Sequence, residues 1–469
     1  MRWIFSFLLL LSLVLLETAN ALSSSGNRLL VISEDESYQD SLKTFWGDLE
    51  EREFKISFES PKSDKLDLFD LGERAYDHLI ILPSKSKGLG PALTPQKLLD
   101  FINSDGNILI TLSGDHHTPT GVLSLLLELD IHLSPDRNSV VVDHFNYDTL
   151  SAAEKHDVLV MPLQSKLRPD VKDFFSSEGI LAIPKPIGQT LGNASPLLVP
   201  ILRAPDTAYS YNYKEETEVV EDPFATGSQL ALVTAVQARN SARLTVIGSV
   251  EMLEDKWFDA TVKGLDGKET KTANREFAKH ITEWTFKEVG VLKVGRLEHY
   301  LSESPAGNDS LVATDYMNPK IYRIKNDVTF NIELSEYSHD YLVPYILPDG
   351  DSIQLEFSML SPFHRLALTP ISNTPNSTIY SVSFTLPDQH GIFRFEVNYK
   401  RLLLTNVDEK REVTVRHFAH DEWPRSFRIS GAWVWISGIW VVVAGWIGFL
   451  ALWLYSAPVD QAKKEKKTQ

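Results

Sequence analysis

Two short segments of the chain place histidines beside carboxylates, a combination that could hold a metal ion. The loop Ser113–Pro119 contains Asp115, His116 and His117, and Asp143-His144 follows a second apolar stretch. Zinc sites in proteins draw their ligands from several positions at characteristic spacings, and neither segment has such partners nearby. We therefore expect no metal and no cofactor here, although both segments should follow strands, where open parallel sheets bind ligands.

The segment Asp349-Gly350-Asp351 has the D-x-D form with which many sugar-nucleotide transferases hold a divalent metal. It follows Pro348, and Pro-Asp-Gly forms a turn by itself, because proline presets one backbone angle and glycine accepts the next. We therefore predict a turn at this position. The lesser alternative is an enzyme that holds a metal on Asp349 and Asp351.

Other motifs of sheet enzymes are absent from the sequence. It contains no G-x-G-x-x-G, no G-x-x-x-x-G-K-[ST] and no G-x-S-x-G. It also contains no cysteine, which excludes both a cysteine nucleophile and disulfide bonds. The formal net charge of −17 argues against nucleic acid as a partner. We expect no catalytic residues.

The N-terminus has the pattern of a secretory signal peptide. Arg2 precedes an apolar run, Trp3–Leu16, and Ala19-Asn20-Ala21 has the small-x-small form of a signal peptidase site. The run is too short to be a membrane span. We predict that residues 1–21 are removed and that the chain after them enters the lumen of the secretory pathway.

The C-terminus has the pattern of a membrane anchor. Residues 429–455 contain no charged side chain. As a helix, this segment is long enough to cross the roughly 30 Å hydrocarbon core. The tail 456–469 is rich in lysine, which places it in the cytosol by the positive-inside rule. Lys466 and Lys467 lie four and three residues from the C-terminus and resemble a dilysine signal for retrieval to the endoplasmic reticulum. The alternative is a stop-transfer tail that is merely lysine-rich.

Small residues recur along this predicted span. Gly431, Gly438 and Gly445 are spaced every seven residues, and Ala444 with Gly448 adds a small-x-x-x-small pair. Small side chains on one face let another helix approach closely. We predict a helix that docks into a larger membrane complex, with a lone anchor as the alternative.

Three asparagines lie in glycosylation sequons, Asn193, Asn308 and Asn376. Such triplets occur by chance, but in a lumenal chain they are candidates for surface glycosylation. Asn193 is the weakest candidate, because Pro196 follows its sequon.

Residues 22–290 alternate short apolar runs with amphipathic segments. This pattern predicts a lumenal α/β domain, which could be two-lobed, with a flavodoxin-like, open and mostly parallel sheet covered on both faces. We expect strands at 28–33, 54–58, 76–82, 107–112, 139–144, 157–161, 229–237 and 243–249, and helices at 38–51, 94–103 and 274–287.

Residues 291–424 lack the helical pattern. Short strand-like runs alternate there with Gly, Pro, Asn and Asp, which is typical of a β-sandwich. We predict a membrane-proximal β-sandwich domain with strands at 321–324, 328–334, 352–357, 381–386, 392–399 and 412–417.

Several segments, in the same order along nearly the whole lumenal chain, resemble the 48 kDa subunit family of the eukaryotic oligosaccharyltransferase complex. They are Tyr76–Leu82, Val142–Asp148, Gln237–Arg243, Trp284–Glu288 with Gly290–Leu292, Asp349–Phe357, and Leu386–Phe395 running on to Asn398–Leu402.

The resemblance implies a non-catalytic accessory or scaffold subunit of the complex that moves a preassembled glycan from dolichol pyrophosphate to asparagine in nascent proteins. The catalytic chain of that complex is a different, many-spanning subunit with a Trp-Trp-Asp-Tyr-Gly motif, which this sequence lacks. The implied partners are the other subunits, including the catalytic chain, and lipid of the endoplasmic reticulum membrane. Contact with glycan or nascent polypeptide stays open.

The resemblance also implies a single-pass type I protein of the endoplasmic reticulum. Its α/β domain resembles sheet folds related to glutamine amidotransferases, whose chemistry the missing cysteine excludes here. The alternative function is a stand-alone lumenal glycan-binding receptor, which would bind glycans through the strand-end loops.

Overall fold

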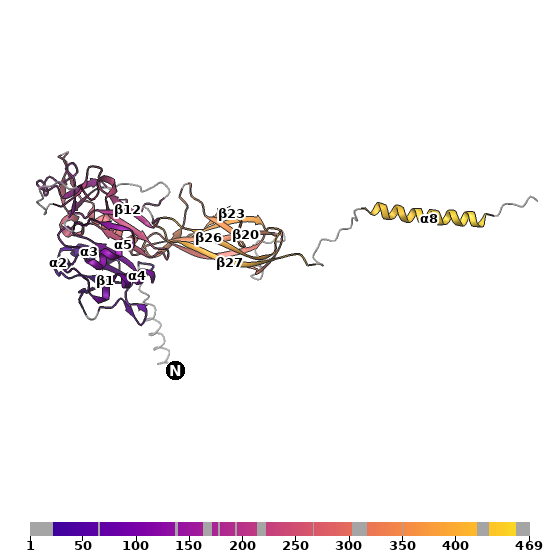
Figure 1. The fold of residues 1–469 in the computed structure, drawn as a ribbon, viewed down its shortest axis with the longest axis horizontal. Coiled ribbons are helices and arrows are strands. Elements are labelled where there is room, and N and C mark those ends of the chain that lie inside the picture. Colours follow the sequence, from indigo (N-terminus) through magenta and orange to yellow (C-terminus); the bar gives the residue numbers. More distant parts are fainter. Residues whose placement is uncertain are drawn as a thin grey trace, which may run out of the picture. The chain divides into compact units, whose positions relative to one another are not determined.

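The structure is a computed structural model with two compact units, residues 1–415 and 416–469 (Figure 1). It describes residues 22–63, 66–136, 139–162, 171–176, 179–192, 195–212, 222–265, 267–302, 317–348, 350–419 and 431–455, leaving out the side chain of Pro362. The first unit contains the α/β region and a second, all-β region, and the second unit contains the apolar helix.

A nine-stranded mixed sheet organises the α/β region. Its parallel part runs in the order β2 (Lys55–Glu59), β1 (Arg28–Ile32), β5 (His78–Ile81), β6 (Asn107–Thr111) and β15 (Arg243–Ile247). Beyond β15 the pairing is antiparallel, with β14 (Ala231–Gln237), β11 (Gln189–Leu191), β7 (Ile131–Leu133) and β12 (Leu198–Arg203).

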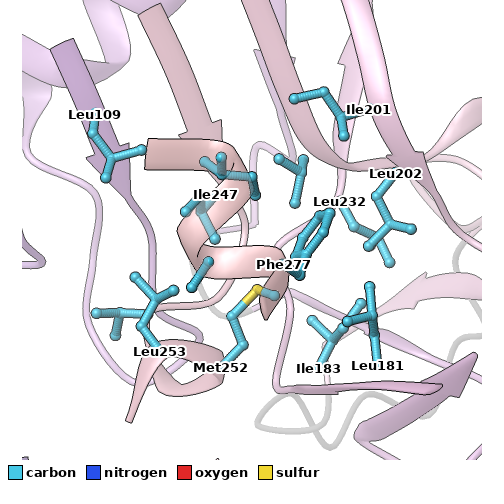
Figure 2. Packing of buried hydrophobic residues seen from close by; sticks show 14 of the residues in the cluster. Leu109, Leu181, Ile183, Ile201, Leu202, Leu232, Ile247, Met252, Leu253 and Phe277 are labelled. Atoms are coloured by element: carbon cyan, nitrogen blue, oxygen red, sulfur yellow. The ribbon is translucent and has the colours of Figure 1, made fainter. Parts of the chain in front are cut away.

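Apart from the edge strand β2, the parallel strands are buried on both faces, as their largely apolar sequences predict. Along β1, Leu29 and Val31 belong to one hydrophobic core, whereas Leu30 and Ile32 belong to another. The first core includes residues of α3 (Lys43–Glu51) and α7 (Asn274–Thr285), and the second includes residues of α4 (Pro95–Asn103) and α5 (Thr120–Glu128). Figure 2 shows Phe277 of α7 packed among aliphatic side chains of the first core.

Local signals account for the helices. Thr94 caps α4, because its hydroxyl oxygen accepts the Lys97 N–H at 3.3 Å, and Pro95 occupies the first turn. The expected helix 38–51 is instead two helices, α2 (Ser37–Ser41) and α3, because the backbone of the buried Leu42 leaves the helical conformation.

The middle of the α/β region differs from the expected parallel pattern. The strands expected at 139–144 and 157–161 are β8 (Val140–Val142) and β9 (Val158–Pro162), and neither joins the main sheet. They form two-stranded antiparallel sheets with β13 (Tyr209–Tyr211) and β10 (Ile180–Pro184). Antiparallel pairs need no crossover helix, which accounts for short strands following one another without helices here.

Shorter elements complete this region. They are β3 (Phe69–Asp70) paired with β4 (Glu73–Arg74), β16 (Thr261–Lys263) paired with β17 (Glu269–Lys271), α6 (Asp255–Phe258), and the 3-10 turns η1 (Pro91–Leu93), η2 (Gly227–Gln229) and η3 (Glu251–Leu253).

The all-β region consists of two five-stranded sheets. One contains β18 (Val291–Leu301), β20 (Asp327–Ser338), β25 (Thr378–Thr385), β24 (Thr369–Asn373) and β21 (Tyr341–Pro344). The other contains β19 (Ile321–Arg323), β27 (Val407–Arg416), β26 (Gly391–Tyr399), β22 (Gln354–Ser358) and β23 (Pro362–Ala367). The rings of Phe330 on β20 and Phe395 on β26 stack with centroids 5.4 Å apart, so aromatic side chains join the two sheets.

The second unit contains α8 (Ala432–Leu454), which has 23 residues and no buried side chain. Among the described residues it is the one helix long and apolar enough to cross a membrane. At 1.5 Å per residue it is about 35 Å long.

Candidate functional site

The loops at the carboxyl ends of the parallel strands carry several carboxylates, each bonded within the protein. Glu34 after β1 accepts hydrogen bonds from the Ser84 hydroxyl at 2.5 Å and from the Ser86 N–H at 2.9 Å. These bonds, with that of Ser84 foremost, lower the pKa of Glu34 to about 2. Glu251 after β15 accepts from the Ser113 hydroxyl at 2.5 Å, while burial raises its pKa.

The histidine segments at strand ends do not assemble a metal site. Asp115 is paired with Lys185 at 2.7 Å, His116 is half-buried and His117 is exposed. Neither histidine belongs to a cluster of three potential metal ligands in the described part of the chain.

Asp143-His144 has a structural role in the same region. Asp143 is buried and accepts the Phe145 N–H at 2.8 Å and the Thr207 hydroxyl at 2.7 Å. His144 lies on the surface, where its ring contacts those of two other residues, His156 and Tyr209.

The turn predicted at the D-x-D segment is present. The Asp351 N–H donates to the Pro348 carbonyl at 3.1 Å, and Gly350 has a φ of 85°. The Asp351 carboxylate accepts from the Arg401 Nε at 2.8 Å and the Tyr399 hydroxyl at 2.6 Å. Burial would raise the pKa of Asp351, but the Arg401 and Tyr399 hydrogen bonds outweigh it, and the pKa lies below its usual value.

Asp351 belongs to a larger contact that we call the seam. It is the surface where the α/β region meets the all-β region, and its central residue is Arg243 at the start of β15. Arg243 is fully buried and donates to the carbonyls of Trp284 at 2.6 Å, Val289 at 2.8 Å and Gly290 at 2.6 Å. Burial lowers its pKa to about 9. A cation at this place suits the carbonyl-rich C-terminal end of α7.

Further hydrogen bonds cross the seam to the all-β region. The Trp284 indole N–H donates to the Leu403 carbonyl at 2.8 Å, and the Gln237 side-chain amide donates to the Leu404 carbonyl. Lys172 bonds both carboxylate oxygens of Glu336, at 2.7 and 2.6 Å. The two regions are therefore joined largely through main-chain carbonyls.

A cleft of about 670 Å³ opens along the seam. Its lining residues are Val171, Pro196, Leu197, Val199, Ala235, Gln237, Arg239, Trp284, Gly350, Asp351, Lys400, Arg401, Leu402, Leu403 and Asn406. A second hollow of about 630 Å³ shares Arg239, Lys400 and Asn406 with it. Among the described residues that line the first cleft, Asp351 is the single acid and is paired with Arg401, so this described lining carries a net positive charge.

The side chains that line the cleft are apolar and basic, apart from Gln237, Asn406 and Asp351. Its described lining contains no serine, threonine, histidine or glutamate. A nucleophile with an adjacent base is therefore absent from these residues. Apolar walls with a few polar groups are what ligand pockets of this size present.

At another place on the seam, carboxylates meet a histidine. The Glu288 carboxylate, wholly buried, accepts from Arg52 at 2.8 Å. Glu283 lies 3.0 Å from the Nε2 atom of His339, whose side chain is 39% exposed. Burial raises the pKa of Glu288 to about 7, and the Glu283 hydrogen bond raises that of His339.

The sequence did not single out these seam residues as a site, although several of them lie in the segments quoted above. Gln237 and Arg243 belong to one segment, Trp284 and Glu288 to another, and Asp351 to a third. The sequence carries one signal, an arginine that opens a largely apolar strand, where an unpaired charge is costly.

The residues predicted for glycosylation, helix packing and retrieval are described only in part by the structure. Asn376 is exposed in the turn between β24 and β25, next to the buried Ser377. On α8, Ala444 is exposed, and a Cβ atom added at Gly438, Gly445 or Gly448 would meet no atom within 4 Å apart from its chain neighbours and the nearby helix backbone. Gly431 precedes the helix with a φ of 84°. Asn193, Asn308, Asp349, Lys466, Lys467 and the predicted signal peptide at 1–21 lie outside the described residues.

A mixed α/β region joined through a buried seam to a region of two β-sheets, followed by one apolar helix, defines a class of multi-domain protein suited to anchorage in a membrane. The chain belongs to the OST48 family. The family model of the OST48 N-terminal domain matches residues 20–288, and that of the OST48 middle domain matches residues 310–457. The resemblance found in the sequence is thereby confirmed.

Its relatives align over nearly their whole length. The chain is 34% identical to the dolichyl-diphosphooligosaccharide–protein glycosyltransferase subunit wbp1 of Schizosaccharomyces pombe, over 90% of this chain and 92% of that protein. It is 29% identical to subunit WBP1 of Saccharomyces cerevisiae, over 96% of each. It is 30% identical to the 48 kDa subunit of Danio rerio, over 91% of each. A solved thua-like protein of Parabacteroides merdae gives a TM-score of only 0.29, with 14% identity over 55% of this chain and 89% of that chain.

Proposed function

We propose that this protein is an accessory, non-catalytic subunit of the oligosaccharyltransferase complex, anchored by α8 in the membrane of the endoplasmic reticulum. The observation that carries the proposal is membership of the OST48 family through both of its domain models. Relatives named as subunits of the dolichyl-diphosphooligosaccharide–protein glycosyltransferase align along nearly the whole chain. The partners are then the other subunits, including the many-spanning catalytic chain, and membrane lipid.

The proposed absence of catalysis rests on the chemistry of the described loops and cleft. The strand-end carboxylates Glu34 and Glu251 are held by serine hydroxyls. Asp351 is held by Arg401, which competes with any metal that a D-x-D segment would bind. A scaffold whose polar groups serve its own fold fits the role of positioning other subunits.

We also propose the finer architecture that the sequence predicts. The parallel strands, numbered along the chain, lie in the order 2-1-3-4-5, the order of flavodoxin-like sheets. The aromatic contacts between the two β-sheets support a sandwich at 291–424. The proposed limits are then a signal peptide at 1–21, the α/β domain at 22–290, the span at 429–455 and the tail at 456–469.

The proposed topology is type I, with the tail bearing Lys466 and Lys467 in the cytosol. The proposed docking face of the span is the stripe of Gly431, Gly438 and Gly445, together with the pair Ala444 and Gly448. Small side chains on one face of a span let another helix approach closely. Asn193, Asn308 and Asn376 remain candidates for glycosylation.

The direct test is affinity purification of the tagged protein from its own membranes in a mild detergent, followed by mass spectrometry. Recovery of a many-spanning oligosaccharyltransferase catalytic chain in near-equal amounts is the expected result. Depletion of the protein should also cause general underglycosylation of secreted proteins. Recovery of the protein alone from several detergents would favour the stand-alone glycan-binding receptor, which would bind glycans through the strand-end loops.

A further inference from the structure

Three potential metal ligands from distant parts of the sequence meet on the seam. Glu283 lies on α7, Glu288 follows that helix, and His339 lies in the turn between β20 and β21. One ligand atom from each lies within 4.8 Å of the others. We propose that Glu283, Glu288 and His339 bind one divalent transition-metal ion, which then bridges the α/β region and the all-β region. One imidazole and two carboxylates suit Zn²⁺ or Mn²⁺.

The carboxylate of Glu288 provides an independent indication of a missing ligand. Its side chain is fully buried. One oxygen, Oε1, accepts from Arg52 at 2.8 Å, but the other, Oε2, has no hydrogen-bond partner among the described residues. A buried carboxylate oxygen without a partner is unusual in folded proteins. A metal ion within reach of Glu283 and His339 would supply what Oε2 lacks.

The surrounding hydrogen bonds orient these side chains as metal ligands require. Ser338 Oγ lies 3.2 Å from the Nδ1 atom of His339, an arrangement that leaves Nε2 facing Glu283. Arg52 holds Glu288 by one oxygen and also bonds the Thr282 hydroxyl at 2.8 Å. Ligating histidines and carboxylates are commonly held by such outer partners.

The backbone of the β20–β21 turn also fixes the imidazole. His339 and Asp340 have φ values of 46° and 80°, in the left-handed region that favours glycine and asparagine. The His339 N–H donates to the Glu288 carbonyl at 3.1 Å, which ties the turn to the end of α7. Histidine and aspartate are among the non-glycine residues that tolerate this region, so the turn holds the imidazole beside the end of α7.

The competing interpretation is an ion-pair network without metal, in which a protonated His339 pairs with Glu283. The charges nevertheless accommodate a metal ion. The formal charges of the two carboxylates, Arg52 and a divalent ion add up to +1. A zinc site formed by two neutral histidines and one glutamate has the same net charge. Lys279 lies 3.9 Å from Glu283 with its side chain 54% exposed, so it can move into solvent when the metal binds.

The test uses the full-length protein, purified through a tag without histidines and stripped with EDTA. Isothermal titration with ZnCl₂ and with MnCl₂, and elemental analysis after gel filtration, measure affinity and stoichiometry. We expect one Zn²⁺ or Mn²⁺ per chain. His339→Asn keeps a residue that tolerates the left-handed turn but has no imidazole, and should weaken binding at least tenfold, as should Glu283→Gln and Glu288→Gln.

The matched control is the double variant His144→Asn/His156→Asn, which removes the two surface histidines in mutual contact elsewhere. It should bind metal as the wild type does. Absence of stoichiometric metal from the wild type, or full binding by a folded His339→Asn protein, would overturn the proposal. If only the control variant lost metal binding, the metal site would lie at His144 and His156, and the proposal would also be overturned. The readout is metal bound, not glycosylation, so it is independent of the proposed function.

Discussion

Removal of the Arg243 side chain is the sharpest perturbation of the seam. Its guanidinium donates to the carbonyls of Trp284, Val289 and Gly290, all at or below 2.8 Å, and lies 4.7 Å from the centre of the Trp284 ring. Each lost hydrogen bond from this charged donor costs about 1.5–3 kcal/mol, although the Trp284 and Gly290 carbonyls keep backbone N–H donors from Lys287 and Thr405. Water entering the space of the lost side chain recovers part of this cost. We therefore expect Arg243→Ala to lower the free energy of unfolding by about 4 kcal/mol, within the range for one-sided disruption of buried charged networks.

The measurement is urea unfolding of the full-length protein in mild detergent, with amide hydrogen exchange to locate the change. Exchange should accelerate first at Thr405, whose N–H donates to the Gly290 carbonyl across the seam at 3.1 Å. Arg239→Ala is the matched control, because Arg239 lies in the same segment but is exposed, and should change stability by less than about 0.5 kcal/mol. A loss below about 1 kcal/mol for Arg243→Ala, or an equal loss for both variants, would refute the reasoning.

Three further predictions follow from other parts of the structure. Burial lowers the pKa values of His78 and His299 to about 4, so the unfolded chain binds more protons between pH 6.5 and 4. The contribution of each histidine to the free energy of unfolding is complete above pH 6.5 and decreases by about 3 kcal/mol as the pH falls toward 4. Urea unfolding at several pH values will measure this decrease. Asp351→Asn removes a partly buried ion pair and should cost about 2 kcal/mol, measured by the same unfolding assay at pH 7, and a change below about 0.5 kcal/mol would contradict it. Replacement of Gly438 and Gly445 by Leu should reduce co-purification of partner subunits while carbonate-resistant membrane insertion is unchanged, and an unaffected complex would mean that the stripe has no packing role.

Periodicity predicted the parallel half of the main sheet better than its antiparallel half. The strands β1, β5, β6 and β15 are continuous apolar runs buried on both faces, and such runs are recognisable in a sequence. The strands β7 and β11 have three residues each, which is too short to show alternation. Their pairing depends on contacts between distant segments and not on local pattern.

The seam could not be predicted for a related reason. Arg243 has no carboxylate within its own segment, and its acceptors are main-chain carbonyls, which carry no residue-specific signal. The cluster joins Glu283 and Glu288, which are five positions apart, to His339, which lies more than 50 positions further along the chain. Motif spacing reveals metal ligands only when they lie close together along the chain. The sequence therefore indicated the loops at His116 and Asp143 as candidate metal sites and did not indicate this cluster.

The composition of the seam bears on how a subunit of this kind would act. Trp284, Gln237 and Arg243 all bond main-chain carbonyls across or along the junction, and the groups that do so are buried. Opening the junction would exchange these hydrogen bonds for bonds to water and would expose the apolar surface buried with them, which is unfavourable. The α/β and all-β regions should therefore move as one body on the timescale of complex assembly. A scaffold that holds partner subunits requires this property, whereas a receptor that closes around a glycan would require a junction made of weaker, solvated contacts.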